Sequence, residues 1–317
     1  MDKVTAKLYR ELDAYLEAHR SEIKSEADVE ALIDRFMQQQ SAKPGITLTK
    51  SEQTAKTAED YVDLADAAKS PEEALSYVKK ALALDPENID ALCMNAVLEG
   101  RDDPNLALSL MSRALEQATA VMERDGWFAD DNIGAFWGLA ETRPYMILLR
   151  HHLECLITCG RMRSAQQEAE RMLTLCENDN LGVRYILMCL YAHFEDREAM
   201  QALHHRFEDA DESQMLLPLC AGFYKLGDLE GAEAYLRRLD AVNPDTREFL
   251  YRVSNETLPE LPEADWTQPD TLEELTFLSL SNPYLFIGME PWFGWACGIL
   301  PPVRKPGKRG STEKRKK

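Results

Sequence analysis

The sequence of 317 residues lacks the long apolar run that a membrane-spanning helix requires. Its most apolar stretch, residues 284–300, is interrupted by Glu290 and Pro291 and is too short to cross a bilayer. The first twenty residues are charged throughout and have no apolar centre, so they do not resemble a secretory signal. We therefore expect a cytoplasmic protein that does not enter a membrane.

Motifs that commonly mark catalytic sites are missing as well. The sequence has no G-x4-G-K-[ST] phosphate-binding loop, no G-x-G-x-x-G turn after a strand, no H-E-x-x-H zinc motif and no G-x-S-x-G nucleophile motif. Strand patterns are nearly lacking, which removes most scaffolds on which those motifs work. Acidic residues are numerous, but no pair stands out as a general acid and base. The sequence therefore predicts a protein that is not an enzyme and needs no cofactor.

Cysteines in pairs are also lacking. The seven cysteines stand singly along predicted helices, their number is odd, and none forms a C-x2-C pair, which is typical of free thiols in a reducing compartment. His151, Cys155 and Cys159 share one helical face and could bind zinc. However, no fourth ligand is evident, and small thiols at a helix contact explain these cysteines more simply. We predict no metal site.

Charge is distributed unevenly along the chain. The net charge is −19, while residues 304–317 hold eight Lys or Arg and one Glu, a local charge of +7 that leaves −26 for the rest. An acidic body argues against binding to nucleic acid or to anionic membranes. The basic tail could contact RNA, ribosomes or an acidic partner, fold back loosely over the body, or merely keep the C-terminus soluble.

Residues 145–185 predict two amphipathic helices joined by a turn at Gly160. Small side chains at Ala165 and Ala169 let the second helix approach the first closely, as an antiparallel hairpin needs. Neither helix can bury its apolar stripe alone, so copies of the unit should stack. The stripe of the first helix follows the 3.6-residue period through Met146, Leu149, Leu153 and Leu156.

Copies of this hairpin are present. The steps between the small residues that follow each turn are 33, 58, 34 and 33 residues, and the second step equals one 34-residue repeat plus an insertion of 24. Arg206 at an expected apolar position makes the fourth copy weaker, and Asp102 at a turn weakens the second. The anchor residues are Ala74, Ala107, Ala165, Ala199 and Ala232.

The pattern resembles the tetratricopeptide repeat, whose second helix reads A-x3-F and closes on proline, as Pro86 and Pro244 do here. The resemblance covers residues 52–250 and implies an all-α, right-handed solenoid of helical hairpins. The sequence segment FWGLAETRPYM, followed by a GR turn and ND-x-x-G-V-R-Y, is similar to that of a group of bacterial tetratricopeptide-like proteins with no assigned activity. Because the repeat serves many purposes, the resemblance implies a fold and not a function.

Changes in composition, and proline and glycine residues that interrupt helices, divide the chain into parts. The predicted parts are an N-terminal helical pair at 1–44, a solenoid at 45–254 with an aromatic insertion at 123–145, a linker and apolar C-terminal segment at 255–303, and a disordered basic tail at 304–317. The N-terminal pair either caps the solenoid or forms a separate arm. Asp270 is expected to cap a short helix, and the apolar stretch after it should dock on the solenoid or on a partner, since exposed it would promote aggregation.

The strongest candidate for binding is the groove lined by the first helix of each hairpin, which in such arrays holds an extended peptide or a partner helix. Basic residues within an acidic body suggest a ligand that bears a carboxylate. Arg184 and Met188 replace the Lys–Asn pair with which chaperone-binding family members clamp a terminal carboxylate, so that clamp is not predicted. The register places in the groove Arg150, Glu154, Arg184, Met188, Tyr191, Tyr224 and Lys225, each of which could equally be an ordinary solvated or packed residue.

The insertion provides a second candidate, an aromatic platform for a ligand, because Trp and Tyr give large contact areas. More often such residues simply pack an inserted loop against the repeats. The platform residues are Trp127, Phe136, Trp137, Arg143 and Tyr145.

These patterns favour a non-catalytic scaffold or adaptor that holds a protein or peptide partner in the groove. One alternative is an accessory protein that associates with nucleic acid or ribosomes through the basic tail. A second alternative is an enzyme of unfamiliar type centred on the insertion, which would need a pocket with a titratable pair.

Overall fold

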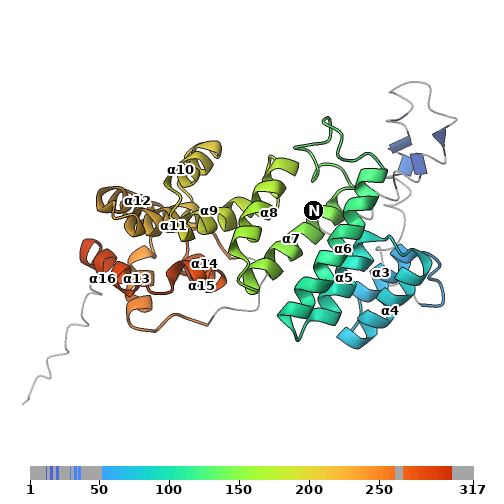
Figure 1. The fold of residues 1–317 in the computed structure, drawn as a ribbon, viewed down its shortest axis with the longest axis horizontal. Helices are drawn as coiled ribbons and strands as arrows, with labels where there is room; N and C mark the ends of the chain where they lie inside the picture. The colour runs from blue at the N-terminus through green and yellow to red at the C-terminus, as the bar shows by residue number, and fades with distance from the viewer. Residues whose placement is uncertain are drawn as a thin grey trace, which may run out of the picture. The chain divides into compact units, whose positions relative to one another are not determined.

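The computed structural model describes residues 52–260 and 267–301, together with single positions between residues 12 and 36. Helices dominate this part of the chain (Figure 1), and an isolated antiparallel bridge between Ala135 and Cys176 is the only extended pairing found in it. The predicted all-α class is confirmed. The basic tail at 304–317 and most of the N-terminal pair at 1–44 lie outside the described residues, and the predicted division into parts stays a prediction.

The chain forms two compact units, and it passes between them three times. The first unit comprises residues 1–129 and 136–151, and the second comprises residues 130–135 and 152–317. The insertion therefore contributes to both. In the second unit, Glu177 N–H donates to the carbonyl of Gly134 at 2.9 Å, beside the Ala135–Cys176 bridge.

The first unit contains two complete helical hairpins. Local sequence fixes the helix starts, because the side chains of Thr57, Ser70, Asn88 and Asp103 each accept a backbone N–H of the first turn. The hairpins are α3 (Ala58–Asp66) with α4 (Pro71–Leu84) and α5 (Ile89–Gly100) with α6 (Pro104–Arg124), followed by the start of α7 (Arg143–Thr158).

The second unit continues the same alternation with the end of α7, then α8 (Met162–Leu175), α9 (Val183–His193), α10 (Arg197–Arg206), α11 (Ser213–Lys225), α12 (Leu229–Val242) and α13 (Thr246–Ser254). Gly160 has a φ of 69° and ends α7 as predicted, and Gly227 with a φ of 75° ends α11 in the same way. These left-handed residues turn each first helix back onto its partner.

The repeat anchors differ in burial as their copies differ in quality. Ala74, Ala165 and Ala232 are buried, whereas Ala107 and Ala199 of the two weaker copies are only half-buried. Arg206, at the position where an apolar residue was expected, donates to the carbonyl of Leu173 at 2.8 Å near the end of α8. Its charge is therefore used to cap a helix instead of filling the core.

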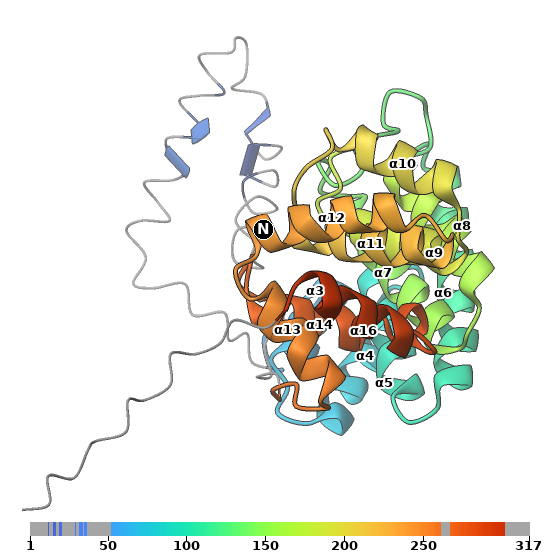
Figure 2. The same ribbon diagram turned by 90° about the vertical axis from the view of Figure 1, so that its left-hand side faces the viewer.

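Three further helices follow the last repeat: α14 (Leu272–Ser281), α15 (Pro283–Phe286) and α16 (Glu290–Ile299). Thr271, and not Asp270 as predicted, caps α14, because Asp270 has a φ of 57° and its carboxylate accepts a hydrogen bond from Ser213. The three helices contact α9, α11, α12 and α13 (Figures 1 and 2). The apolar C-terminal stretch thus docks on the repeats of its own chain.

A close approach between two helices in the first unit generates a test of the repeat packing. A Cβ atom on Gly100 would lie 2.4 Å from the Cα of Ala107, so α5 and α6 would have to move apart. We expect Gly100→Ala to lower the free energy of unfolding by about 1–3 kcal/mol, measured by urea denaturation. Ser76→Ala on the exposed side of α4 is the control, and equal stability of both variants would contradict this packing.

Candidate functional site

Helix α11 is buried along almost its whole length. Every residue from Met215 to Phe223 is buried, so the helix has no solvated face. A helix that is apolar all round must be covered on all sides. In the second unit α9, α10 and α12 contact α11, and α14 and α15 cover it further. We call the sides of α9, α11 and α13 against which α14–α16 lie the inner face.

Apolar side chains of α14–α16 fill the inner face. Trp292 is fully buried and lies 4.7 Å from the ring of Phe293 and 6.0 Å from that of Phe286, measured between ring centroids. Trp295 contacts the ring of Tyr224 on α11 at 5.2 Å. The other buried apolar side chains in and beside α14–α16 are Leu275, Leu278, Leu285, Met289, Ala296 and Leu300. An apolar helical segment therefore already occupies this surface.

A buried polar network fixes the start of α14. The side-chain amide of Asn243 donates to Ser213 Oγ at 3.1 Å and to the Thr271 carbonyl at 3.2 Å. Ser213 Oγ in turn donates to the Asp270 carboxylate at 3.1 Å. Because each of these groups finds a partner, the network specifies one register for α14.

The structure places three of the predicted groove residues in the interior or against neighbouring helices. Met188 is fully buried and cannot contact a partner in this conformation. Tyr191 is also buried, and its hydroxyl donates to Glu170 at 2.9 Å. Tyr224 faces Trp295 of the docked C-terminal segment. The sequence register did not indicate that these side chains have partners within the chain.

Lys225 is engaged by the end of α9. Its ammonium group donates to the carbonyls of Ala192 at 3.2 Å and His193 at 3.0 Å, at the C-terminal end of α9. Burial lowers the pKa of Lys225, and the nearby carboxylate of Glu195 opposes this shift. Lys225 therefore serves as a helix cap in this structure.

Arg184 is engaged by two carboxylates of its own chain. Its guanidinium lies 3.1 Å from Asp179 and 3.2 Å from Glu212, and it also contacts the Tyr185 hydroxyl. Only 18% of the Arg184 side chain and 1% of the Asp179 side chain are exposed. The pair therefore stabilises the start of α9, where Asp179 also accepts the Val183 N–H at 2.7 Å. Arg184 is not available to a ligand carboxylate.

The other two groove candidates lie on α7. Arg150 is half-buried and Glu154 is exposed. They belong to different units, since the first unit ends at residue 151. Their role in binding stays a prediction.

The aromatic platform is largely a packed core within the first unit. Phe136 and Tyr145 are fully buried, and the ring of Phe128 lies 5.6 Å and 5.7 Å from theirs. The Tyr145 hydroxyl is 2.8 Å from Thr119 Oγ1. These contacts agree with the interpretation that the aromatic residues pack the insertion.

Arg143 and Trp137 hold the end of the insertion. Arg143 Nε donates to the Trp137 carbonyl at 2.7 Å, and its guanidinium lies 5.9 Å from the centroid of the Trp137 ring. Trp127 follows the end of α6, where its N–H donates to the Met122 carbonyl at 3.0 Å. Trp127 and Trp137 are half-buried, so part of each ring reaches solvent.

The described residues show neither a metal site nor a membrane-spanning helix. Within residues 52–260 and 267–301, no group of three or more His, Cys, Asp or Glu side chains has the arrangement of a metal site. No helix in the part of the chain that the structure covers has the length and apolar content needed to cross a membrane. Burial raises the pKa of the Cys155 thiol, which disfavours the thiolate that zinc needs.

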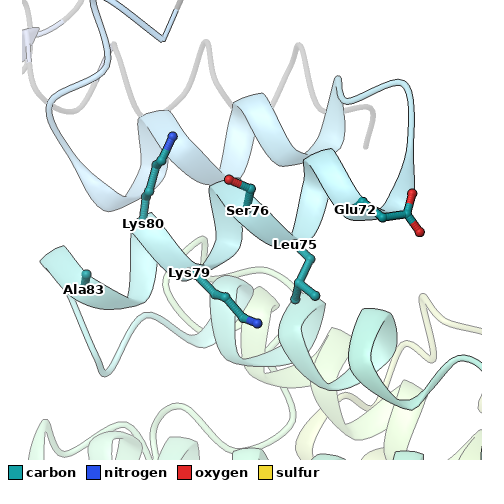
Figure 3. Close-up of a pocket in the computed structure, with 6 residues that line it drawn as sticks. All are labelled: Glu72, Leu75, Ser76, Lys79, Lys80 and Ala83. Atoms are coloured by element: carbon teal, nitrogen blue, oxygen red, sulfur yellow. The ribbon is translucent and has the colours of Figure 1, made fainter.

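A groove on the first unit is lined by one side of α4 (Figure 3), with Leu75 and Ala83 as its apolar members. Its charged members are all paired. Glu72 contacts Arg101 at 2.9 Å, Lys79 contacts Glu99 at 3.1 Å, and Lys80 contacts Glu52. The groove has no unpaired charge for a ligand.

Comparisons with known proteins add a structural neighbour. No protein-family model matches the chain, and no curated protein matches its sequence. A crystal structure of MamA protein is similar, with 14% sequence identity and a TM-score of 0.41 over 65% of this chain and 98% of that chain. The identity and TM-score are too low to transfer a function or a partner to this protein.

The Arg184–Asp179 pair generates a pH-dependent prediction. Burial raises the pKa of Asp179 above its unfolded value, so ionisation of this carboxyl weighs against the folded state as pH rises from about 4 to neutrality. Arg184 opposes that effect. We expect Arg184→Met to lower the free energy of unfolding by about 2–3 kcal/mol at pH 7, and by less at pH 4, in urea titrations.

Asp179→Asn provides the control, because asparagine keeps the capping acceptor and tolerates the left-handed φ of 48° at this position. In that background Arg184→Met should cost little at either pH. A full loss of stability in the double variant would show that the ion pair is not the cause.

Proposed function

We propose that the protein is a non-catalytic scaffold or adaptor that holds a helical segment of a partner protein on the inner face of its repeats. The observation that carries this proposal is the filling of the inner face of α9, α11 and α13 by α14–α16. A surface that binds a helix within the chain has the shape and apolar character to bind one from another protein.

The contacts of two of the three predicted groove cations bear on the kind of partner. Arg184 is paired with Asp179 and Glu212, and Lys225 donates to helix carbonyls, so neither is free to attract a carboxylate. The apolar content of the inner face favours a partner helix over the carboxylate-bearing ligand that the basic groove residues suggested. Among the predicted groove residues, Glu154 is exposed, and Tyr224 is half-buried beside Trp295.

The proposal also includes three statements that follow from the sequence patterns. The protein works in the cytoplasm, it catalyses no reaction, and it belongs with the bacterial tetratricopeptide-like proteins that share the FWGLAETRPYM wording. Absent motifs support the first two statements, and the sequence resemblance supports the third.

Partner capture tests the scaffold function. Full-length protein and the variant Tyr224→Ala, altered on the inner face, are immobilised and exposed to lysate of the native cell, and captured proteins are quantified by mass spectrometry. We expect the captured amount of specific partner proteins to fall by about tenfold or more with this variant, because truncation of central interface residues costs on the order of 2 kcal/mol of binding free energy.

A matched control carries changes on the opposite side of the hairpin. Leu229 and Arg237 lie on α12 with exposed side chains, so Leu229→Ala/Arg237→Glu should retain the captured set. Circular dichroism verifies that both variants fold. If both variants capture the same proteins as the parent, the inner face is not the binding surface.

A further inference from the structure

The helices that cover the inner face are held in two different ways. α14 is fixed by polar contacts. Besides the network around Asn243, the Leu272 N–H donates to Asp245 at 3.1 Å, and Gln214 donates to Glu274 at 3.1 Å. Residues 283–300, which comprise α15 and α16 and which we call the strap, are held mainly by apolar contacts.

Apart from the Tyr284 hydroxyl, which donates to the Asn282 side chain at 2.7 Å, the polar contacts of the strap are few and weak by comparison. His193 Nδ1 lies 3.2 Å from the Tyr284 carbonyl, and Ser254 Oγ lies 3.5 Å from Cys297 Sγ. The buried indole N–H of Trp292 has no nitrogen or oxygen acceptor and faces the Cys220 sulfur, a weak acceptor. The strap therefore lacks the network that fixes the register of α14.

The strap is also a poor helix. Gly294 lies in the interior of α16 and Gly298 in its last turn, and glycine within a helix is less favourable than alanine. Packing does not require them, because a Cβ atom added at either position would meet nothing within 4 Å. Gly288, with a φ of 75°, forms a joint between α15 and α16. The strap can therefore leave its site at low cost to its own structure.

We propose that the strap is an exchangeable internal ligand, and that the partner is a protein helix with the same buried pattern. In α16 and just after it, that pattern is an aromatic residue, a small residue four positions later and a leucine four further on, at Trp292, Ala296 and Leu300. The inference rests on the proposed scaffold function and specifies both its partner and its regulation.

The nature of the surface beneath the strap requires exchange. Tyr224 and Cys220 on α11 lie under Trp295 and Trp292. If the strap left without a replacement, apolar area on α11 would be exposed to water, which is unfavourable. A helix that presents an aromatic and a leucine side chain at the same spacing restores that burial. The strap thus keeps the inner face closed until a partner competes for it.

Hydrogen exchange on the full-length protein tests whether the strap opens. We expect amides of residues 283–300 to exchange faster than those of α11, and Gly294→Ala/Gly298→Ala to slow the strap by on the order of tenfold, because it strengthens the helix without a clash. Ile287→Ala is the control, since this side chain is 79% exposed on the same segment. Strap amides as protected as those of α11, and unchanged by the glycine substitutions, would overturn the proposal.

Fluorescence anisotropy tests the partner pattern with a synthetic peptide. The probe is residues 288–301 with C297S and three added lysines for solubility. It should bind Trp295→Ala, in which the strap loses its contact with Tyr224, at least tenfold more tightly than Gly294→Ala/Gly298→Ala. A peptide with W292A and L300A should not bind. Equal affinity for all proteins, or no binding to folded Trp295→Ala, would refute exchange.

These measurements separate the strap from the scaffold function. One outcome is rapid strap exchange with peptide binding, while the inner-face variant captures the same proteins as the parent. That outcome would support the exchangeable strap and reject the scaffold function. Captured partners with a protected strap and no peptide binding would leave the scaffold and reject exchange.

Discussion

The second unit depends on the need to cover α11 on every side. A helix in a repeat array ordinarily keeps one solvated face, but α11 buries all residues from Met215 to Phe223. Neighbouring repeats cover its flanks, and α14–α16 complete the enclosure. The docking of the C-terminal helices, the pairing of Tyr224 with Trp295 and the polar network around Asn243 all follow from this requirement.

The hairpin fold could be predicted from the sequence because its determinants are local. The small anchor residue, a turn such as that at Gly160 and the apolar stripe of each helix all operate within one repeat, and the repeat then recurs along the chain. The two weaker copies could be identified as well, from Arg206 and Asp102, and their anchors are indeed less buried in the structure. The cap of α14 was misplaced, because Asp270 and Thr271 are both good capping residues and a distant Ser213 engages the first of them.

The binding surface could not be predicted to the same degree, because its determinants are distant in sequence. The repeat register places Arg184 on the first helix of a hairpin, but it does not indicate that Asp179 and Glu212 lie on either side of the guanidinium. Likewise it does not bring Trp295 to Tyr224. Two signals were nevertheless present: the apolar run within α11 and an apolar aromatic C-terminal stretch. Together they indicate that one covers the other.

The two units differ in how much of a first helix must be covered. In the first unit, α5 buries only Ala91, Cys93, Ala96 and Gly100, and Val97 is exposed, so its free side tolerates water without a cover. In the second unit, α11 does not tolerate water, and yet its cover ends in a helix weakened by two glycines that packing does not need. A permanent cap would gain stability from alanine at both positions. The weak helix α16 covers a surface of α11 that must stay covered. This combination favours the replacement of α16 by another helix and disfavours an opening that leaves α11 exposed.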